Sequence, residues 1–271
     1  MRILKTAITL HWGLNLPLLL AVVAFPAIAD LPLHADEAKV ARPSGSARAR
    51  QLHYLHNGEP DAVVLLAPPP RPDSAEQEAD MAEVVAIQRA CTTNQAVVAF
   101  SEKKFSVFNF APAVGDSFKP DRFPKTGAFF EQVERDAAAA ADEAKEYWKR
   151  PRPFTINPSL ALGKLEKSFS YPSGHATEGM VLALVLAELF PDRREAVLAI
   201  GRDLGWHRVW IARHYPTDIY AGRVFAQAIV RQMKASPDFQ HDLAEAKAEI
   251  ASTAQTAETP LQPPVRATAA H

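Results

Sequence analysis

The sequence predicts an all-α protein with a single helical-bundle domain, and three observations support this. Apolar residues recur at helical spacing, as in Met81, Val84 and Ile87. No segment alternates convincingly between polar and apolar residues, and only the short apolar run over 62–66 suits a strand. Strands that alternate with helices are missing as well, so we do not expect an α/β sheet.

Composition narrows the class of protein. The chain has 271 residues, 48% of them hydrophobic and 23% charged, with a formal net charge of -1. These proportions exclude a collagen, a largely disordered chain and a polytopic membrane protein. They also argue against a nucleic-acid partner, because binding through bulk positive charge needs a basic chain. The single cysteine, Cys91, cannot form an intrachain disulfide, so core packing must stabilise the fold.

The N-terminus has the layout of a secretory signal peptide. Arg2 and Lys5 precede an apolar run over 14–25, and residues 27–29 read Ala-Ile-Ala, a small-x-small cleavage pattern. The apolar run is too short to span a bilayer, which needs about 20 residues. We therefore expect cleavage after residue 29, a periplasmic or secreted mature protein, and no stable membrane insertion.

Breaks in composition divide the rest of the chain. Residues 30–60 are polar and irregular, which predicts an N-terminal arm or linker. Residues 251–271 are rich in Ala, Thr, Pro and Gln, which predicts a disordered tail. The helical domain between them covers residues 61–250.

Caps and prolines set the helix boundaries inside this domain. Ser74 and Gln77 form a capping-box signature, and Ser236-Pro237 reads as an N-cap followed by Pro at the first helical position. After the helix that opens at Ser74, we expect helices over 101–110, 124–148, 174–190, 193–213, 216–234 and 237–250. Trp206 and Trp210 are four residues apart, and we expect both in the core.

Three clusters in the second half of the chain combine cations, histidines, a hydroxyl, a flexible turn and a carboxylate. In chain order they read Lys145-x6-Arg152-Pro153, Pro172-Ser173-Gly174-His175 and Arg208-x5-His214-x3-Asp218. These are the groups needed to hold and attack a phosphate, whose transition state spreads negative charge over three oxygens.

The phosphate-binding half of this chemistry follows from residue type. Arg152 and Arg208 can each donate paired hydrogen bonds to phosphate oxygens, and Lys145 adds a compact charge. Ser173 and Gly174 stand where a loop enters a helix, whose N–H groups and dipole favour an anion. Gly174 also lets the backbone approach the oxygens closely.

The residues alone leave two candidates for the nucleophile, Ser173 and a histidine. Asp218 can accept a hydrogen bond from one ring nitrogen of His214 and fix its tautomer, which frees the other nitrogen to attack phosphorus. His175 would then protonate the leaving alcohol. One histidine must be neutral and the other charged, which predicts a bell-shaped pH dependence.

The three clusters together resemble the signature of the type 2 phosphatidic acid phosphatase superfamily. The exported architecture is most similar to its bacterial class A non-specific acid phosphatases, as are the segments 65–70, 170–171 and 236–239. The resemblance covers about residues 60–250. It implies an all-helical domain of the acid phosphatase/vanadium haloperoxidase type that needs neither a metal nor another cofactor.

The resemblance also implies roles for individual residues. His214 would form a phosphohistidine, Asp218 would orient it, and His175 would be the general acid. The residues implied to bind phosphate are Lys145, Arg152, Ser173, Gly174 and Arg208. The family usually has Ser immediately before the arginine of the third cluster, and this chain has His207 there. A hydroxyl contact to phosphate or backbone is therefore lost or replaced.

These observations lead to an expected function, an exported acid phosphatase that hydrolyses small phosphate monoesters. The principal alternative is a lipid phosphate or diphosphate phosphatase of the same superfamily. A vanadium-dependent haloperoxidase and a non-enzymatic anion-binding protein are further alternatives. Whether the chain forms a homo-oligomer stays open.

Overall fold

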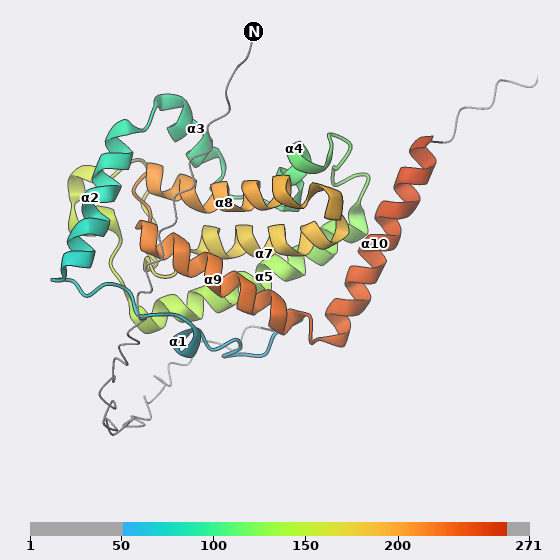
Figure 1. The fold of residues 1–271 in the computed structure, drawn as a ribbon, viewed down its shortest axis with the longest axis horizontal. Coiled ribbons are helices and arrows are strands. Elements are labelled where there is room, and N and C mark those ends of the chain that lie inside the picture. Colours follow the sequence, from blue (N-terminus) through green and yellow to red (C-terminus); the bar gives the residue numbers. More distant parts are fainter. Residues whose placement is uncertain (1–50, 259–271) are drawn as a thin grey trace, which may run out of the picture. The chain divides into compact units, whose positions relative to one another are not determined.

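The computed structural model describes residues 51–258, and every regular element in this part of the chain is helical (Figure 1). The prediction of an all-α protein is therefore confirmed. The predicted signal peptide over 1–29 lies outside the described residues, as do most of the predicted arm and the end of the predicted tail. Within 51–258, no helix combines the length and apolar character that crossing a bilayer requires.

Helix α7 (Gly174–Leu189) lies at the centre of the domain. Around it pack α8 (Arg194–Trp210), α9 (Pro216–Met233) and α5 (Pro124–Trp148), as Figure 1 shows. Most residues of α7 are buried, and a helix enclosed by neighbours needs apolar residues on nearly all its sides. Helix α10 (Pro237–Glu258) packs against α5.

Small residues let α7 and α8 approach closely. A Cβ atom on Gly201 of α8 would lie 2.5 Å from the Cβ of Ala183 and 2.9 Å from the carbonyl oxygen of Gly179. One turn further, a Cβ on Gly205 would lie 2.8 Å from the Cβ of Ala176. Because glycine has no side chain at these two positions, α8 can lie directly against the first half of α7.

Helix α5 has the predicted boundaries. Pro124 occupies its first turn, where a missing N–H costs no helical hydrogen bond. Lys149 adopts a left-handed conformation, with φ 49°, and ends the helix. Helix α8 ends at Trp210, short of the predicted end at 213, and Ala212 in the following turn also has a positive φ of 50°.

Helices α2 (Ala75–Ala90) and α3 (Thr93–Ser101) contact α8. The predicted cap of α2 is present, because Ser74 Oγ accepts from the backbone N–H of Gln77 at 3.2 Å.

The predicted helix over 101–110 is wrong. That segment contains the 3-10 turn η1 (Val107–Phe110), followed by the short helix α4 (Ala111–Val114). Ser106 accepts from Phe108, and its own N–H donates to Asn109, so this pair nucleates a turn rather than a continuous helix. The remaining short elements are α6 (Pro153–Ile156), η2 (Pro158–Leu160) and η3 (Pro191–Arg193).

Both ends of the described chain are more ordered than the sequence predicted. Tyr54 and Leu55 are buried, and their N–H groups donate to the carboxylate of Asp136 at 2.7 and 3.1 Å. The last part of the predicted arm is therefore packed against α5. The apolar run after it forms α1 (Ala62–Leu65) instead of a strand. Helix α10 continues to Glu258, so residues 251–258 are helical.

Candidate active site

The three clusters meet where α5 ends, α7 begins and α8 turns into α9. The backbone N–H of Ser173 donates to the carbonyl oxygen of Asp218 at 3.0 Å, which joins the second cluster to the third. Arg152 Nη1 lies 3.2 Å from His214 Nε2, which joins the first cluster to the third. All four of these residues are buried. Stretches far apart in sequence therefore form one buried polar cluster inside the bundle, which we call the cup and which comprises the residues of the three clusters.

His214 lies between a carboxylate and a guanidinium. Its Nδ1 is 3.4 Å from Asp218 Oδ2, and its Nε2 faces Arg152. The same oxygen of Asp218 accepts from Ser170 Oγ at 2.6 Å and from the N–H of Tyr215 at 2.9 Å. Since a carboxylate faces Nδ1 and a cationic donor faces Nε2, the proton belongs on Nδ1 and the lone pair on Nε2.

The charge states of this pair follow from their surroundings. Burial lowers the pKa of His214 to about 3, and the positive charge of Arg152 adds to that effect. Burial opposes ionisation of Asp218, but the hydrogen bond with His214 and the charge of Arg150 outweigh it and lower its pKa to about 2. The site therefore holds a neutral imidazole beside a carboxylate above about pH 3.

Arg150 is a residue of the site that the sequence analysis missed. Its Nη1 donates to Asp218 Oδ1 at 2.6 Å, and its Nη2 donates to Asp80 Oδ2 at 2.7 Å. The guanidinium also lies over the ring of Tyr215, 3.9 Å from the centroid. The only signal in the sequence is the Arg-x-Arg spacing with Arg152, which does not show which arginine faces which partner.

Arg152 is fixed by neutral groups. Its Nε and Nη2 donate to the carbonyl oxygen and the hydroxyl of Ser168, at 2.7 and 3.0 Å. Its Nη1 donates to the carbonyl oxygen of Arg213 at 2.8 Å. These partners hold the guanidinium in one orientation without neutralising its charge, as an anion-binding group requires.

Lys145 reaches the start of α7 from the last turn of α5. A Cβ on Gly174 would lie 2.9 Å from Lys145 Nζ and 3.1 Å from Glu178 Oε1, so only glycine fits there without a shift. Burial lowers the pKa of Lys145, and it raises the pKa of Glu178 to about 7. Glu178 was not predicted as part of the site, and its carboxyl group makes this edge of the cup sensitive to pH.

Ser173 caps α7, because its Oγ accepts from the N–H of Ala176 at 3.3 Å. The hydroxyl hydrogen itself is not used in that contact and can still be donated.

His175 lies on the first turn of α7, beside the segment that follows α3. Its Nε2 is 3.1 Å from the carbonyl oxygen of Glu102, so Nε2 carries a proton and Nδ1 is left for other chemistry. Burial, the nearby charge of Arg208 and the interaction with His214 together lower the pKa of His175 to about 3. The two histidines therefore share one electrostatic environment.

Glu102 is a second residue that the sequence analysis missed. Its carboxylate accepts from His207 Nδ1 at 2.8 Å and lies 3.7 Å from Arg208 Nη2. Arg208 donates to the carbonyl oxygen of Ala99, and within residues 51–258 its buried Nε has no hydrogen-bond partner. His207, which stands where the resembled family usually has Ser, thus binds a carboxylate beside the predicted phosphate ligand Arg208.

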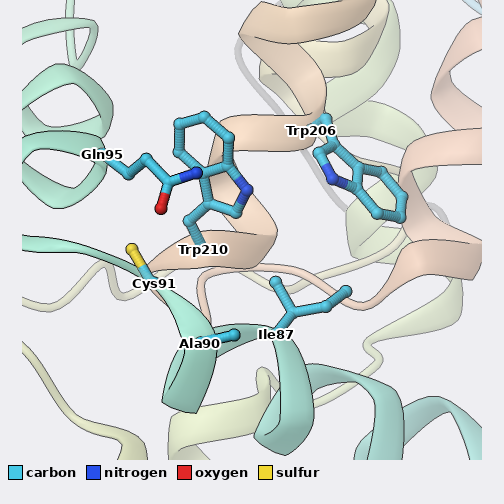
Figure 2. Close-up of a pocket in the computed structure, with 6 residues that line it drawn as sticks. All are labelled: Ile87, Ala90, Cys91, Gln95, Trp206 and Trp210. Atoms are coloured by element: carbon cyan, nitrogen blue, oxygen red, sulfur yellow. The ribbon is translucent and has the colours of Figure 1, made fainter.

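A separate cavity of about 160 Å³ lies between α2, α3 and α8. Figure 2 shows Gln95 and Cys91 next to the ring of Trp210, with the ring of Trp206 on the other side and Ile87 and Ala90 of α2 below. Both tryptophans are half-buried, so neither lies fully inside the core as predicted, although Trp206 packs against its edge. On a helix, residues 206 and 210 share a face and residue 208 points the other way. This cavity is therefore not the cup that contains Arg208.

Among residues 51–258, no group of three or more His, Cys, Asp or Glu side chains is arranged to hold a metal ion.

The chain is similar to one protein family and to three known proteins of related activity. Residues 137–240, which include all three clusters, match the PAP2 superfamily. The chain is 31% identical over 211 residues to a non-specific acid phosphatase of Providencia stuartii, covering 74% of this chain and 85% of the relative. It is 28% identical over 217 residues to an acid phosphatase of Zymomonas mobilis, covering 77% and 81%. A shorter match, 43% over 56 residues, is to a lipid A 1-phosphatase of Rhizobium etli and covers 21% and 24%.

Proposed function

The chain belongs to the PAP2 superfamily and is a phosphomonoester hydrolase, and from this premise we propose that it acts through a phosphohistidine on His214. The observation that carries this proposal is the pair of contacts on the ring of His214. Asp218 faces Nδ1 at 3.4 Å and Arg152 faces Nε2 at 3.2 Å. A neutral imidazole held in this way presents its lone pair toward the cation that would bind the phosphate.

The proposed reaction has two steps. In the first, the Nε2 lone pair of His214 attacks phosphorus, the bond from phosphorus to the ester oxygen breaks, and His175 gives the leaving oxygen a proton. In the second, His175 takes a proton from water, the water oxygen attacks phosphorus, and the bond to Nε2 breaks. Inorganic phosphate leaves and both histidines return to their starting states.

Four groups are suited to hold the phosphate oxygens during these steps. Arg152 and Lys145 supply positive charge at the ends of the first cluster, and the backbone at Gly174 lies at the N-terminus of α7. Arg208 offers a buried Nε that has no partner among the described residues. A buried donor left unsatisfied costs about 1–3 kcal/mol, so an anion that accepts from it is favoured.

The low pKa of His175 has a consequence for its role as an acid. Burial and the surrounding positive groups keep this ring neutral down to about pH 3. A phosphomonoester brings between one and two negative charges into the cup, which raises the pKa of His175 again. We therefore propose that His175 takes up its proton together with the substrate, which favours activity at acid pH.

The test of the nucleophile compares His214→Ala with His56→Ala, a variant of an exposed histidine. On a chromogenic phosphate monoester, we expect His214→Ala to lose at least about 10³-fold in kcat and His56→Ala to match the parent chain. Rapid quenching of the parent enzyme should trap phosphate in an acid-labile, base-stable bond, and His214→Ala should trap none. Undiminished turnover by His214→Ala would rule out the mechanism.

Export is also proposed, on the strength of the signal-peptide pattern over residues 1–29. Edman sequencing of enzyme from the periplasm or the medium should begin at Asp30. Recovery of uncleaved enzyme from the cytoplasm alone would contradict export.

A lipid phosphate is the second candidate substrate, because the chain is 43% identical to a lipid A 1-phosphatase over 56 residues. Turnover of a soluble ester should be compared with turnover of phosphatidate in mixed micelles. A kcat/KM that is higher for the micellar substrate would favour this second function.

A further inference from the structure

Two surface segments beside the cup expose large apolar side chains. On α3, Val97 and Phe100 are 62% and 40% exposed, and they share one face of the helix because they are three residues apart. After η2, Leu162 and Leu165 are 38% and 40% exposed. A Cβ on Gly163 would lie 3.4 Å from the ring of Phe100, so the two segments touch.

The same two segments carry four lysines with exposed side chains. Lys103 and Lys104 follow α3, and Lys164 and Lys167 flank Leu165. We call the apolar residues and these lysines, from residues 97–104 and 162–167, the basic apolar patch. Scattered exposed apolar residues are normal on a surface, but a contiguous group rimmed by one sign of charge marks an interaction site.

The acidic residues of these segments do not offset the lysines. Glu102 is bonded to His207 and lies near Arg208, and Glu166 lies 2.9 Å from Arg213 Nε. Both carboxylates are half-buried and already paired with cationic or imidazole groups inside the domain. The outward-facing charge of the basic apolar patch is therefore positive, which suits an anionic partner.

The patch is continuous with the candidate active site. Backbone carbonyl oxygens of the two segments accept from Arg208, at Ala99, and from Arg213, at Leu162. The carbonyl oxygen of Glu102 also bonds to the proposed general acid His175. Whatever docks on the patch is therefore held beside the rim of the cup.

We propose that the basic apolar patch docks the enzyme on an anionic lipid surface. Apolar side chains that enter the headgroup region, together with lysines that meet anionic headgroups, form the combination that peripheral proteins use at such surfaces. An acidic polymer would need the lysines but would gain nothing from the exposed Val97, Phe100 and Leu165. The further step, in which docking presents phosphorylated amphiphiles to the cup, rests on the proposed function; the docking itself does not.

The test uses sedimentation of the purified enzyme from Asp30 onward, without the apolar run over 14–25, with vesicles of phosphatidylcholine, with and without phosphatidylglycerol. Lys103→Gln/Lys104→Gln should weaken partitioning onto the anionic vesicles about 30-fold, because each lysine near such a surface contributes a factor of about five. Val97→Ser/Leu165→Ser should weaken it as well. The matched controls are Lys119→Gln/Arg122→Gln and Val224→Ser, which change exposed residues outside the patch.

Partitioning that requires the anionic lipid, falls in both patch variants and survives in both controls supports the proposal. Equal binding to neutral vesicles, or equal loss in the controls, overturns it. A change of oligomeric state in the patch variants without vesicle binding also overturns it, because the patch is then an interface between copies. All variants carry the same N-terminal residues, so differences between them report on the patch.

Catalysis is measured separately. His214→Ala should bind vesicles like the parent chain, and the patch variants should retain kcat/KM on a soluble ester. Vesicle binding by an inactive His214→Ala would support docking even if the proposed mechanism failed on other grounds. Loss of soluble-ester activity in the patch variants would show instead that these segments serve the cup itself, and the docking proposal would be rejected.

Discussion

Arg150 and Asp218 form a buried ion pair directly behind the proposed nucleophile, with 2.6 Å between Nη1 and Oδ1. The two carboxylate oxygens of Asp218 have different partners. Oδ1 meets the guanidinium, while Oδ2 meets Ser170 and lies 3.4 Å from the ring of His214. Arg150 also binds Asp80 of α2 at 2.7 Å, so one cation fixes two buried carboxylates.

The first prediction is that Arg150→Met lowers the free energy of unfolding by about 3–5 kcal/mol, because it leaves Asp80 and Asp218 buried without their cation. Urea unfolding measures this, with exposed Arg135→Met expected within about 0.5 kcal/mol of the parent chain. Arg150→Lys keeps the positive charge but loses the paired N–H donors of the guanidinium. Its free energy of unfolding should therefore lie between those of Arg150→Met and the parent chain. If Arg150→Met unfolds at the parent's urea concentration, the ion pair has no structural role.

Sequence patterns were sufficient for the elements whose boundaries are local. Pro124 indicated the start of α5, and Ser74 indicated the start of α2. The failure at 101–110 is also local. Thr92 and Gln95 form the capping box that starts α3, and Ser106 turns the chain inside the Phe-rich run for which the sequence predicts a helix.

The residues of the candidate active site also fall into two groups, those with a local signal in the sequence and those without one. The motifs identified Arg152, His214 and Asp218, and the structure brings them together. Arg150 and Glu102 could not be predicted, because their roles depend on partners that are 68 and 105 residues away along the chain. Charged residues are usually solvated, and nothing local shows that the bundle buries these two.

The second prediction concerns stability against pH. His175 and His214 each have a pKa near 3 in the folded chain, against an ordinary value of 6.5. Between these values the unfolded chain binds more protons, so acid destabilises the fold by about 1.4 kcal/mol per pH unit for each histidine. Glu178 acts in the opposite sense between 4.5 and about 7, because the folded chain keeps its proton there.

Between pH 4.5 and 6.5, these three groups together make the unfolded chain bind about one proton more than the folded chain. Between pH 3 and 4.5 the difference is about two protons. Glu178→Gln removes the opposing contribution, so its free energy of unfolding should fall more steeply than the parent's as pH drops from 6.5 to 4.5. The difference in slope is about 1.4 kcal/mol per pH unit. Parallel slopes in urea titrations of the two chains would show that Glu178 titrates normally.

The third prediction compares two helical glycines. Gly201→Ala places a methyl group 2.5 Å from the Cβ of Ala183, and backbone atoms of Gly179 leave it no escape. Overpacking of this kind costs about 1–3 kcal/mol. Gly127→Ala meets only the ring of Phe108 at 3.2 Å, which can turn aside, and it gains helix propensity. Thermal melts should therefore show a lower Tm for Gly201→Ala and an unchanged or higher Tm for Gly127→Ala.

The fourth prediction tests why His207 stands in this chain where the resembled family usually has Ser. His207 holds the carboxylate of Glu102 at 2.8 Å, while Arg208 lies 3.7 Å from the same group. In His207→Ser, Arg208 is the nearest cation that remains to Glu102 within residues 51–258, so the carboxylate competes with phosphate for that guanidinium. We expect KM for a soluble ester and Ki for inorganic phosphate to rise together by about tenfold, with a smaller change in kcat.

The double variant Glu102→Gln/His207→Ser removes the competing charge and should restore both constants. An unchanged Ki in His207→Ser, or no rescue by Glu102→Gln, would mean that His207 stabilises the segment after α3 without controlling access of the phosphate to Arg208.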